Sequence, residues 1–227
     1  MNSKNWKIGA FTFLILGCIQ FMILTIIAML FYKGGTYIDK STMNYLFWYN
    51  YFSDLGRTLS HSGVPNMISY ILFTVTLALW GISQFPFYIA FPSLFENSKR
   101  LKKLSIIGSV FGIFTGICYI GIAFTPSDIL SFIHDLFVVL GFGSIFLCLI
   151  LISYTIFQDK NYPNFYAKIL AISAIILSVY YLSFFLVQTG NNSIRLLVAA
   201  TGQKIMIYTL LICSIIQGYG ALKQKAS

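Results

Sequence analysis

Long apolar stretches separated by short polar segments run through the whole chain. A helix needs roughly 20 mostly apolar residues to cross the hydrocarbon core of a bilayer. Six stretches reach that length, so the pattern predicts an all-α, polytopic membrane protein with one membrane domain over residues 1–227. The predicted spans are Ile8–Tyr32, Pro65–Phe91, Leu104–Phe124, Leu130–Phe157, Phe165–Val187 and Leu196–Ala221.

Composition excludes the soluble alternatives. The chain is 58% hydrophobic and 9% charged, whereas soluble domains average about 45–50% apolar and about 25% charged residues. So few polar residues cannot cover a water-soluble globule. The net charge of +9 does not require a nucleic acid partner, because basic residues beside a membrane complement anionic lipids.

The distribution of Lys and Arg predicts the orientation, since short basic loops remain in the cytoplasm. With both termini cytoplasmic, we expect ten basic residues inside and four outside, which indicates a protein of the cell membrane. The inner residues are Lys4, Lys7, Lys99, Arg100, Lys102, Lys103, Lys160, Lys168, Lys223 and Lys225, and the outer ones are Lys33, Lys40, Arg57 and Arg195.

The first outer connection, Lys33–Val64, is long for a structureless loop in a compact bundle. In its second half, Asn44–His61, polar residues recur at spacings that place them on one face of a helix. These residues are Asn50, Ser53, Asp54, Arg57 and His61. The remaining positions are rich in aromatic residues, which favour a membrane–water interface. We therefore predict one outer interfacial helix here, with its polar face toward the bundle.

A second group of polar residues lies at the start of the fourth span. The segment Thr125–Asp128 has the order of a helix start, with Thr as N-cap and Pro in the first turn. From there Asp128, Ser131 and Asp135 share a helical face, with His134 beside them. Asp135 is then roughly 10 Å deeper in the membrane than Asp128, and an ionisable residue at that depth is a candidate functional group.

Lys204 lies inside the sixth predicted span. An unpaired lysine there costs about 2.5–3.5 kcal/mol, so we expect it to face the bundle and to pair with Asp54 or Asp135. These observations define a predicted polar site that consists of Asn50, Ser53, Asp54, Arg57, His61, Asp128, Ser131, His134, Asp135 and Lys204.

Small residues recur along the third span at Ser105, Gly108, Gly112 and Gly116. Such a stripe lets another helix approach closely in a membrane, where no hydrophobic force drives helices together. We expect the partner to be a helix of the same chain.

The run Asn50-Tyr51-Phe52-Ser53-Asp54-Leu55-Gly56 resembles the N-x-x-S-D-L-G signature of an uncharacterised prokaryotic family of six-helix membrane proteins. The later run Ser131-Phe132-Ile133-His134-Asp135 is similar to the His-containing helix of that family and of the eukaryotic Frag/DRAM/Sfk group. The resemblance covers about residues 45–150 and carries over Ser53, Asp54, Gly56, His134 and Asp135. It implies a role in membrane-lipid biology and specifies no reaction.

Three functions remain open at this stage. The first is a lipid-associated protein without a cofactor, whose outward-facing polar site binds a lipid headgroup or another small polar ligand. The second is a metal-dependent intramembrane lipid hydrolase, with Asp54, His61, His134 and Asp135 as zinc ligands around an activated water. The third is a proton- or ion-coupled transporter that uses Asp135 and Lys204 as a switchable pair. The predicted partners are membrane lipids, and the sequence does not specify an oligomeric state.

Overall fold

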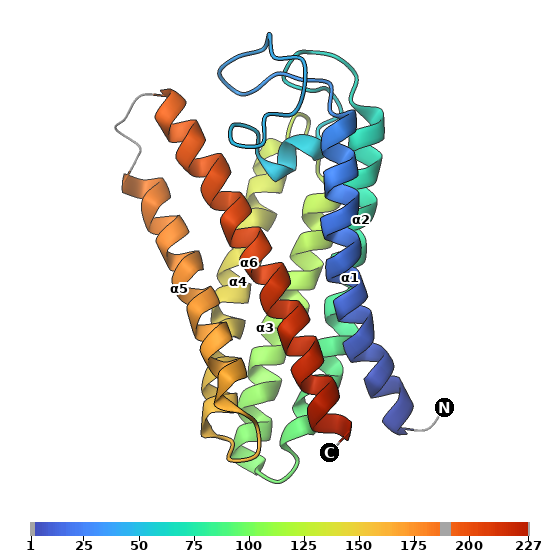
Figure 1. Ribbon diagram of the computed structural model, residues 1–227, viewed down its shortest axis with the longest axis vertical. Helices are drawn as coiled ribbons and strands as arrows, with labels where there is room; N and C mark the ends of the chain where they lie inside the picture. The colour runs from blue at the N-terminus through green and yellow to red at the C-terminus, as the bar shows by residue number, and fades with distance from the viewer. Residues whose placement is uncertain (1–2, 187–191, 227) are drawn as a thin grey trace.

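The computed structural model describes residues 3–186 and 192–226, and within them the protein is an all-helical bundle (Figure 1). The long helices are α1 (Ser3–Phe31), α2 (Met67–Ala90), α3 (Lys99–Phe124), α4 (Ser131–Gln158), α5 (Asn164–Leu186) and α6 (Asn192–Ala226). Two short 3₁₀-helices, η1 (Phe52–Gly56) and η2 (Phe91–Phe95), lie before and after α2. In this part of the chain six helices are long and apolar enough to cross a membrane, which confirms the six predicted spans. Val187, the last residue predicted for the fifth span, lies outside the described residues.

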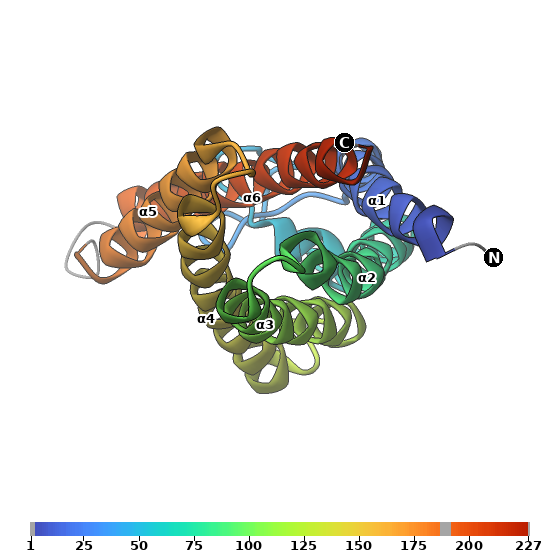
Figure 2. The ribbon, with the colours of Figure 1, turned by 90° about the horizontal axis from the view of Figure 1, so that it is seen from below.

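The helices form a ring in which each packs against its neighbours in sequence and α6 closes against α1 (Figure 2). Helix α5 lies at the edge of this ring, and α4 and α6 are its main contacts. The predicted small-residue stripe packs inside the chain, as expected. Gly116 on α3 meets Gly81 on α2 so closely that a Cβ atom added at Gly116 would lie 2.6 Å from the carbonyl oxygen of Gly81.

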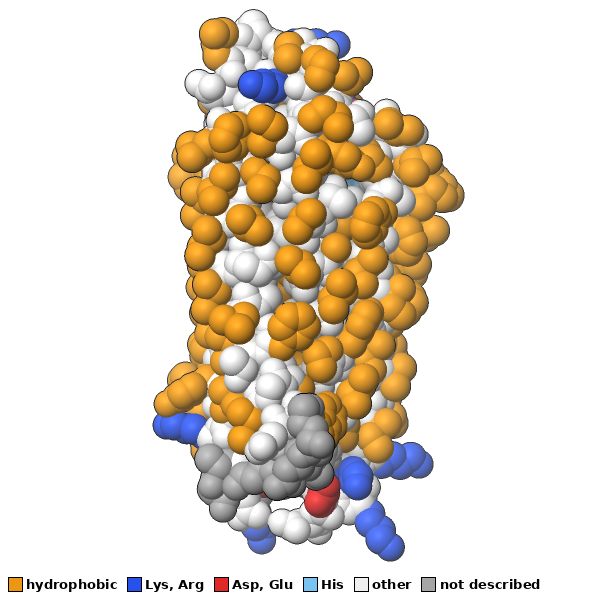
Figure 3. Space-filling view, turned by 90° about the vertical axis from the view of Figure 1, so that its right-hand side faces the viewer, with side chains coloured by type: hydrophobic (Ala, Val, Ile, Leu, Met, Phe, Trp, Pro, Cys, Tyr) orange, Lys and Arg blue, Asp and Glu red, His pale blue; other side chains and the backbone are white. Residues whose placement is uncertain are grey.

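Residues 32–66, which we call the cap, fold over one end of the bundle between α1 and α6 (Figure 1). We refer to this end as the cap end and to the opposite end, where both termini lie, as the terminal end. Charged side chains gather at the two ends of the α1–α2 side of the molecule, and hydrophobic side chains cover the middle (Figure 3). This distribution matches a protein whose middle faces lipid.

The prediction of an interfacial helix over Asn44–His61 is wrong. The segment contains turns and the five-residue helix η1, and its chain doubles back beside the ends of α1 and α6. The reason is that its polar side chains bond to the backbone of the cap itself, as described below. These local bonds compete with a regular helix, as Asn, Asp and Ser side chains commonly do.

The start of α4 also differs from the prediction. The helix begins at Ser131, and Thr125–Leu130 form a turn in which the amides of Ile129 and Leu130 donate to the carbonyl of Pro126. Asp128 therefore lies outside the helix, and its carboxylate binds the cap instead of the first turn of α4.

Candidate functional site

The centre of the cap is a fully buried asparagine, Asn50, whose side chain and backbone connect three segments. Its side-chain Nδ2 donates to the carbonyl of Gly35 at 2.9 Å and to Oδ2 of Asp54 at 3.0 Å, while its Oδ1 accepts from the amide of Leu46 at 2.9 Å. Its backbone carbonyl accepts a hydrogen bond from the ammonium group of Lys204 on α6. Every polar atom of this amide side chain is thus used, which holds the cap in one conformation.

Asp54 is buried and accepts hydrogen bonds at both carboxylate oxygens. Besides Asn50, the amide of Tyr51 donates to Oδ2 at 2.9 Å, and Nε2 of His61 lies 3.0 Å from Oδ1. The His61 side chain is 12% exposed and that of Asp54 6%. This pair connects the buried carboxylate to the surface of the cap.

Lys204 is 1% exposed although it lies within a membrane span. Its ammonium donates to the carbonyls of Asn50 and Ala200 and lies 5.2–5.6 Å from the ring centroids of Tyr45, Phe47 and Phe52. Ring faces within about 6 Å attract a cation. Among the described residues no carboxylate forms an ion pair with Lys204, so the predicted pairing with Asp54 or Asp135 is replaced by an indirect link to Asp54 through Asn50.

The aromatic residues of the cap therefore form a cage around a buried cation, whereas the sequence predicted only that they lie at the interface. Sequence reasoning also missed Gln203, whose Oε1 accepts from the amide of Phe52 at 2.8 Å, and Thr201, whose hydroxyl donates to the carbonyl of Trp48 at 3.4 Å. Their position beside Lys204 was the available signal. Together these α6 residues hold the segment from Trp48 to Phe52.

Asp128 fastens the other edge of the cap. Its carboxylate accepts from the hydroxyl of Thr58 at 2.6 Å, the amide of Thr58 at 3.1 Å and the amide of Leu59 at 2.9 Å. Burial alone would raise the pKa of Asp128, but these hydrogen bonds outweigh burial and hold it below its ordinary value. The carboxylate is therefore ionised at neutral pH.

Two tyrosines of the cap, Tyr45 and Tyr51, lie near the carboxylate of Asp54. Burial, together with the nearby charge of Asp54, raises the pKa of Tyr51 to about 12. Burial likewise raises the pKa of Tyr45 well above its ordinary value, with Asp54 contributing in the same direction. Both phenols therefore stay protonated at neutral pH, and the hydroxyl of Tyr45 donates hydrogen bonds to the carbonyls of Asn50 and Tyr51.

The remaining members of the predicted polar site do not join this network. His134 is buried, and its Nδ1 donates to the carbonyl of Thr125 at 2.7 Å. Ser131 and Asp135 are exposed on the first turns of α4. The helix α4 begins at Ser131 and not at Pro126, and Asp135 in its second turn is exposed, so the predicted inward orientation of Asp135 is wrong.

Ser53 and Arg57 also differ in their surroundings. Ser53 and His134 both line a small internal cavity of about 40 Å³, with Gln203 as a third polar member. The guanidinium of Arg57 donates to the carbonyl of Leu59 at 3.1 Å. The cavity has room for a water molecule and is too small for a lipid headgroup.

The predicted zinc ligands Asp54, His61, His134 and Asp135 are not gathered at one point. Within residues 3–186 and 192–226, no group of three or more His, Cys, Asp or Glu side chains is placed to hold a metal ion. The described geometry lends the hydrolase and the transporter no specific support, and both stay predictions.

Beside the cap lies an external groove of about 590 Å³ between α5 and α6, which we call the cap groove. Its lining consists of Trp48, Ile176, Val179, Tyr180, Ser183, Leu197, Val198, Thr201, Gly202 and Ile205. The hydroxyl groups of Ser183 and Thr201 donate to backbone carbonyls. An occupant of the groove would therefore meet almost only hydrocarbon and aromatic surface.

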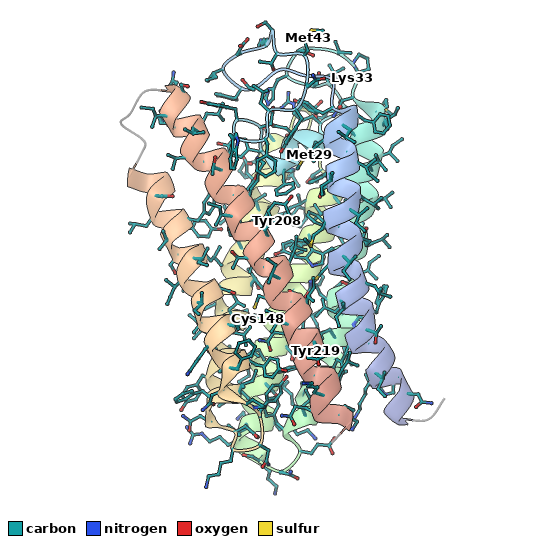
Figure 4. The ribbon with its side chains drawn as sticks, viewed as in Figure 1. Met29, Lys33, Met43, Cys148, Tyr208 and Tyr219 are labelled. Atoms are coloured by element: carbon teal, nitrogen blue, oxygen red, sulfur yellow. The ribbon has the colours of Figure 1, made fainter. Side chains whose placement is uncertain are left out.

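The cap groove is lined both by the cap, through Trp48, and by helices α5 and α6. Trp48 belongs to the cap, and its carbonyl is held by Thr201. The cap lies between the upper parts of α6 and α1, and Met43 and Lys33 lie at its outer edge (Figure 4). The cap network therefore fixes one wall of the groove.

Comparison of the chain with protein-family models, with curated proteins and with solved structures found no match. The resemblance of Asn50–Gly56 and Ser131–Asp135 to the six-helix family accordingly stays a prediction.

Proposed function

We propose that this is an integral protein of the cell membrane that binds a membrane lipid at its cap end. In this proposal the cap faces outward and both termini lie in the cytoplasm. The orientation follows from the excess of Lys and Arg at the terminal end. The lipid thus comes from the outer leaflet.

The observation that carries the proposal is the cap groove. Its volume of about 590 Å³ is within the range of about 300–1,000 Å³ of small-ligand sites. It lies on α5 and α6, which are long and apolar enough to cross a membrane, so in this proposal lipid hydrocarbon surrounds it. A lipid chain is the ligand whose chemistry matches such a lining.

The polar end of the lipid has a matching cationic group at the cap end of α6. Arg195 is exposed in the first turn of α6, immediately before the groove residues Leu197 and Val198. A guanidinium binds phosphate oxygens with paired, charge-assisted hydrogen bonds. We therefore assign the headgroup to the level of Arg195 and the hydrocarbon chain to the groove below it.

This proposal gives the buried polar network a positioning role. The Asn50 and Asp54 side chains already have partners inside the cap, so they have little capacity left for a headgroup. Through Lys204, Gln203 and Thr201 the network holds the segment that includes Trp48 against α6. The network thereby keeps the groove in shape.

The chain offers a matched pair of variants to test the site. Ile205 lines the cap groove and is 55% exposed, while Ile212, two turns further along α6, is 51% exposed and lies outside the groove. The substitution Ile205→Trp fills the groove, and Ile212→Trp adds the same ring elsewhere on the lipid-facing side.

The measurement is native mass spectrometry of the purified protein after reconstitution with a defined phospholipid mixture. We expect Ile205→Trp to lose a retained lipid that the wild type and Ile212→Trp keep, and Arg195→Gln to weaken its retention. Equal retention in all four proteins, each with unchanged thermal unfolding, would contradict the proposal.

A further inference from the structure

A second external groove lies on the other side of α5, between α4 and α5, and we call it the terminal groove. It has a volume of about 690 Å³. Its lining consists of Phe146, Ile150, Ser153, Tyr154, Phe157, Ala167, Lys168, Ala171, Ala174, Ile175, Ser178, Val179 and Leu182. On α5 it runs from Ala167 to Leu182, which corresponds to about 22 Å along the helix axis. This length exceeds half of the roughly 30 Å hydrocarbon core.

The interior of the terminal groove offers no free polar group at its serines. The hydroxyl of Ser153 donates to the carbonyl of Ala167 at 2.8 Å, and that of Ser178 donates to the carbonyl of Ala174 at 2.9 Å. The first bond also ties α4 to α5 beneath the groove. What remains along its length is hydrocarbon surface.

The end of the groove near the termini is different, because it is basic. Lys168 lines the groove and is exposed. Arg100, at the start of α3, donates from its guanidinium to the hydroxyl of Tyr154 at 3.3 Å, and Tyr154 also lines the groove. Two cationic side chains from different helices thus lie near one end of the terminal groove.

Two acidic residues lie near this mouth in sequence, Glu96 before α3 and Asp159 after α4, and in the described part of the chain neither forms an ion pair with its cations. Asp159 follows α4 directly, and its carboxylate accepts hydrogen bonds from the amides of Asn161 and Tyr162. Among the described residues, neither Lys168 nor Arg100 forms an ion pair with a carboxylate. Both cations at this end of the groove are therefore available to an anionic ligand.

We propose that the terminal groove binds one anionic phospholipid of the leaflet at the terminal end, with its phosphate between Lys168 and Arg100 and a hydrocarbon chain along α5. The positive charge at the mouth favours an anionic headgroup. The apolar interior, whose serine hydroxyls already bond to backbone carbonyls, accepts the hydrocarbon chain. This site uses another helix pair and the opposite leaflet from the cap groove. It does not depend on the lipid proposed there.

The test measures retention of phosphatidylglycerol against phosphatidylcholine by native mass spectrometry of the full chain reconstituted with both lipids. The double variant Lys168→Gln/Arg100→Gln removes the two cations at the groove. Lys102→Gln/Lys103→Gln removes the same charge from exposed positions of α3 that do not line the groove. At about 1 kcal/mol for each basic residue, we expect the first double variant to lose the preference for phosphatidylglycerol by roughly tenfold or more, and the second to keep it.

A pair of groove-filling variants tests where the chain lies. Ile175 lines the terminal groove and is 61% exposed, whereas Ile172 on the same helix is 51% exposed and lines neither groove. We expect Ile175→Trp to reduce retention and Ile172→Trp to leave it unchanged. Free glycerol phosphate in excess should not displace the lipid, because it lacks the chain.

Several results would overturn the assignment. Equal losses in the two charge variants would show that general attraction to basic residues is responsible. Displacement by glycerol phosphate would indicate a simple phosphate site. A dimer that disappears with Ile175→Trp would show that a second copy of the chain occupies the groove. Ile205 lines the cap groove and not the terminal groove. The Ile205→Trp result therefore tests the cap-groove proposal alone, and the variants at Lys168, Arg100 and Ile175 test the terminal groove alone.

Discussion

Lys204 on α6 donates a hydrogen bond from its ammonium group to the backbone carbonyl of Asn50, 154 residues earlier in the chain. The same asparagine donates from its side chain to Asp54. The buried cation and the buried carboxylate therefore interact through Asn50, and this arrangement attaches the cap to the bundle. The stability of the cap should depend on both charges together.

Substituting Lys204 with Met tests this coupling. Removing the ammonium group leaves the buried carbonyl of Asn50 without this donor, at a cost of about 1–3 kcal/mol, or more where a charged group is involved. We expect Lys204→Met to lower the free energy of unfolding by about 3 kcal/mol, because Asp54 keeps its bonds to Asn50 and His61. Thermal unfolding in detergent and proteolysis of the cap would measure the effect.

The control is a double-mutant cycle with Asp54→Asn. Coupled residues give a double variant that is less destabilised than the sum of the single variants. Additive effects of Lys204→Met and Asp54→Asn would show that the two charges act independently.

Asp128 should make the attachment of the cap dependent on pH. Its pKa in the folded protein is below the ordinary value of 3.8, so ionised Asp128 stabilises the folded state. This contribution is fully present above the ordinary pKa and is lost as the pH falls through the lowered pKa. We expect Asp128→Asn to reduce the unfolding temperature at neutral pH, with the difference from wild type shrinking below pH 3.8. A difference that grows on acidification would contradict this assignment.

The contact between α2 and α3 should tolerate no side chain at Gly116. A Cβ atom there would lie 2.6 Å from the carbonyl oxygen of Gly81, a backbone atom that no side-chain rotation can move. We expect Gly116→Ala to destabilise the bundle by about 1–3 kcal/mol. Gly143→Ala is the control, since nothing lies within 4 Å of its Cβ position, and alanine favours a helix by about 0.5–1 kcal/mol.

Two buried tyrosines should respond differently to loss of the hydroxyl group. Tyr45 donates to the carbonyls of Asn50 and Tyr51 at 3.2 Å and 3.0 Å, so Tyr45→Phe should cost about 1 kcal/mol. The hydroxyl of Tyr119 has no hydrogen-bond partner among the described residues. We expect Tyr119→Phe to cost less than Tyr45→Phe in the same unfolding assay. The reverse order would mean that the Tyr119 hydroxyl has a partner in the membrane-embedded protein.

The sequence predicted the six spans to within a few residues, since hydropathy and length follow from local composition alone. It also predicted that Lys204 turns inward, because the alternative is costly in lipid, but the ammonium group bonds to backbone carbonyls and not to a carboxylate. The form of the cap could not be predicted in this way. The spacing of Asn50, Asp54 and His61 fits a helix face, yet the same residues converge in a compact turn.

The missed contacts share one cause, namely that they join distant segments through backbone groups. Asp128 bonds to the amides of Thr58 and Leu59, and His134 bonds to the carbonyl of Thr125. Backbone amides and carbonyls occur at almost every position, so a sequence pattern does not identify which of them a side chain will reach.

The most direct test of the account is a cryo-EM structure of the protein in nanodiscs that contain the defined phospholipid mixture, with a bound antibody fragment to aid alignment. The account predicts a continuous lipid-chain density in the cap groove between Trp48 and Ile205, with its headgroup beside Arg195. A cap groove that is filled by part of a second protein chain, or by side chains of α5 and α6 moved together, would contradict it.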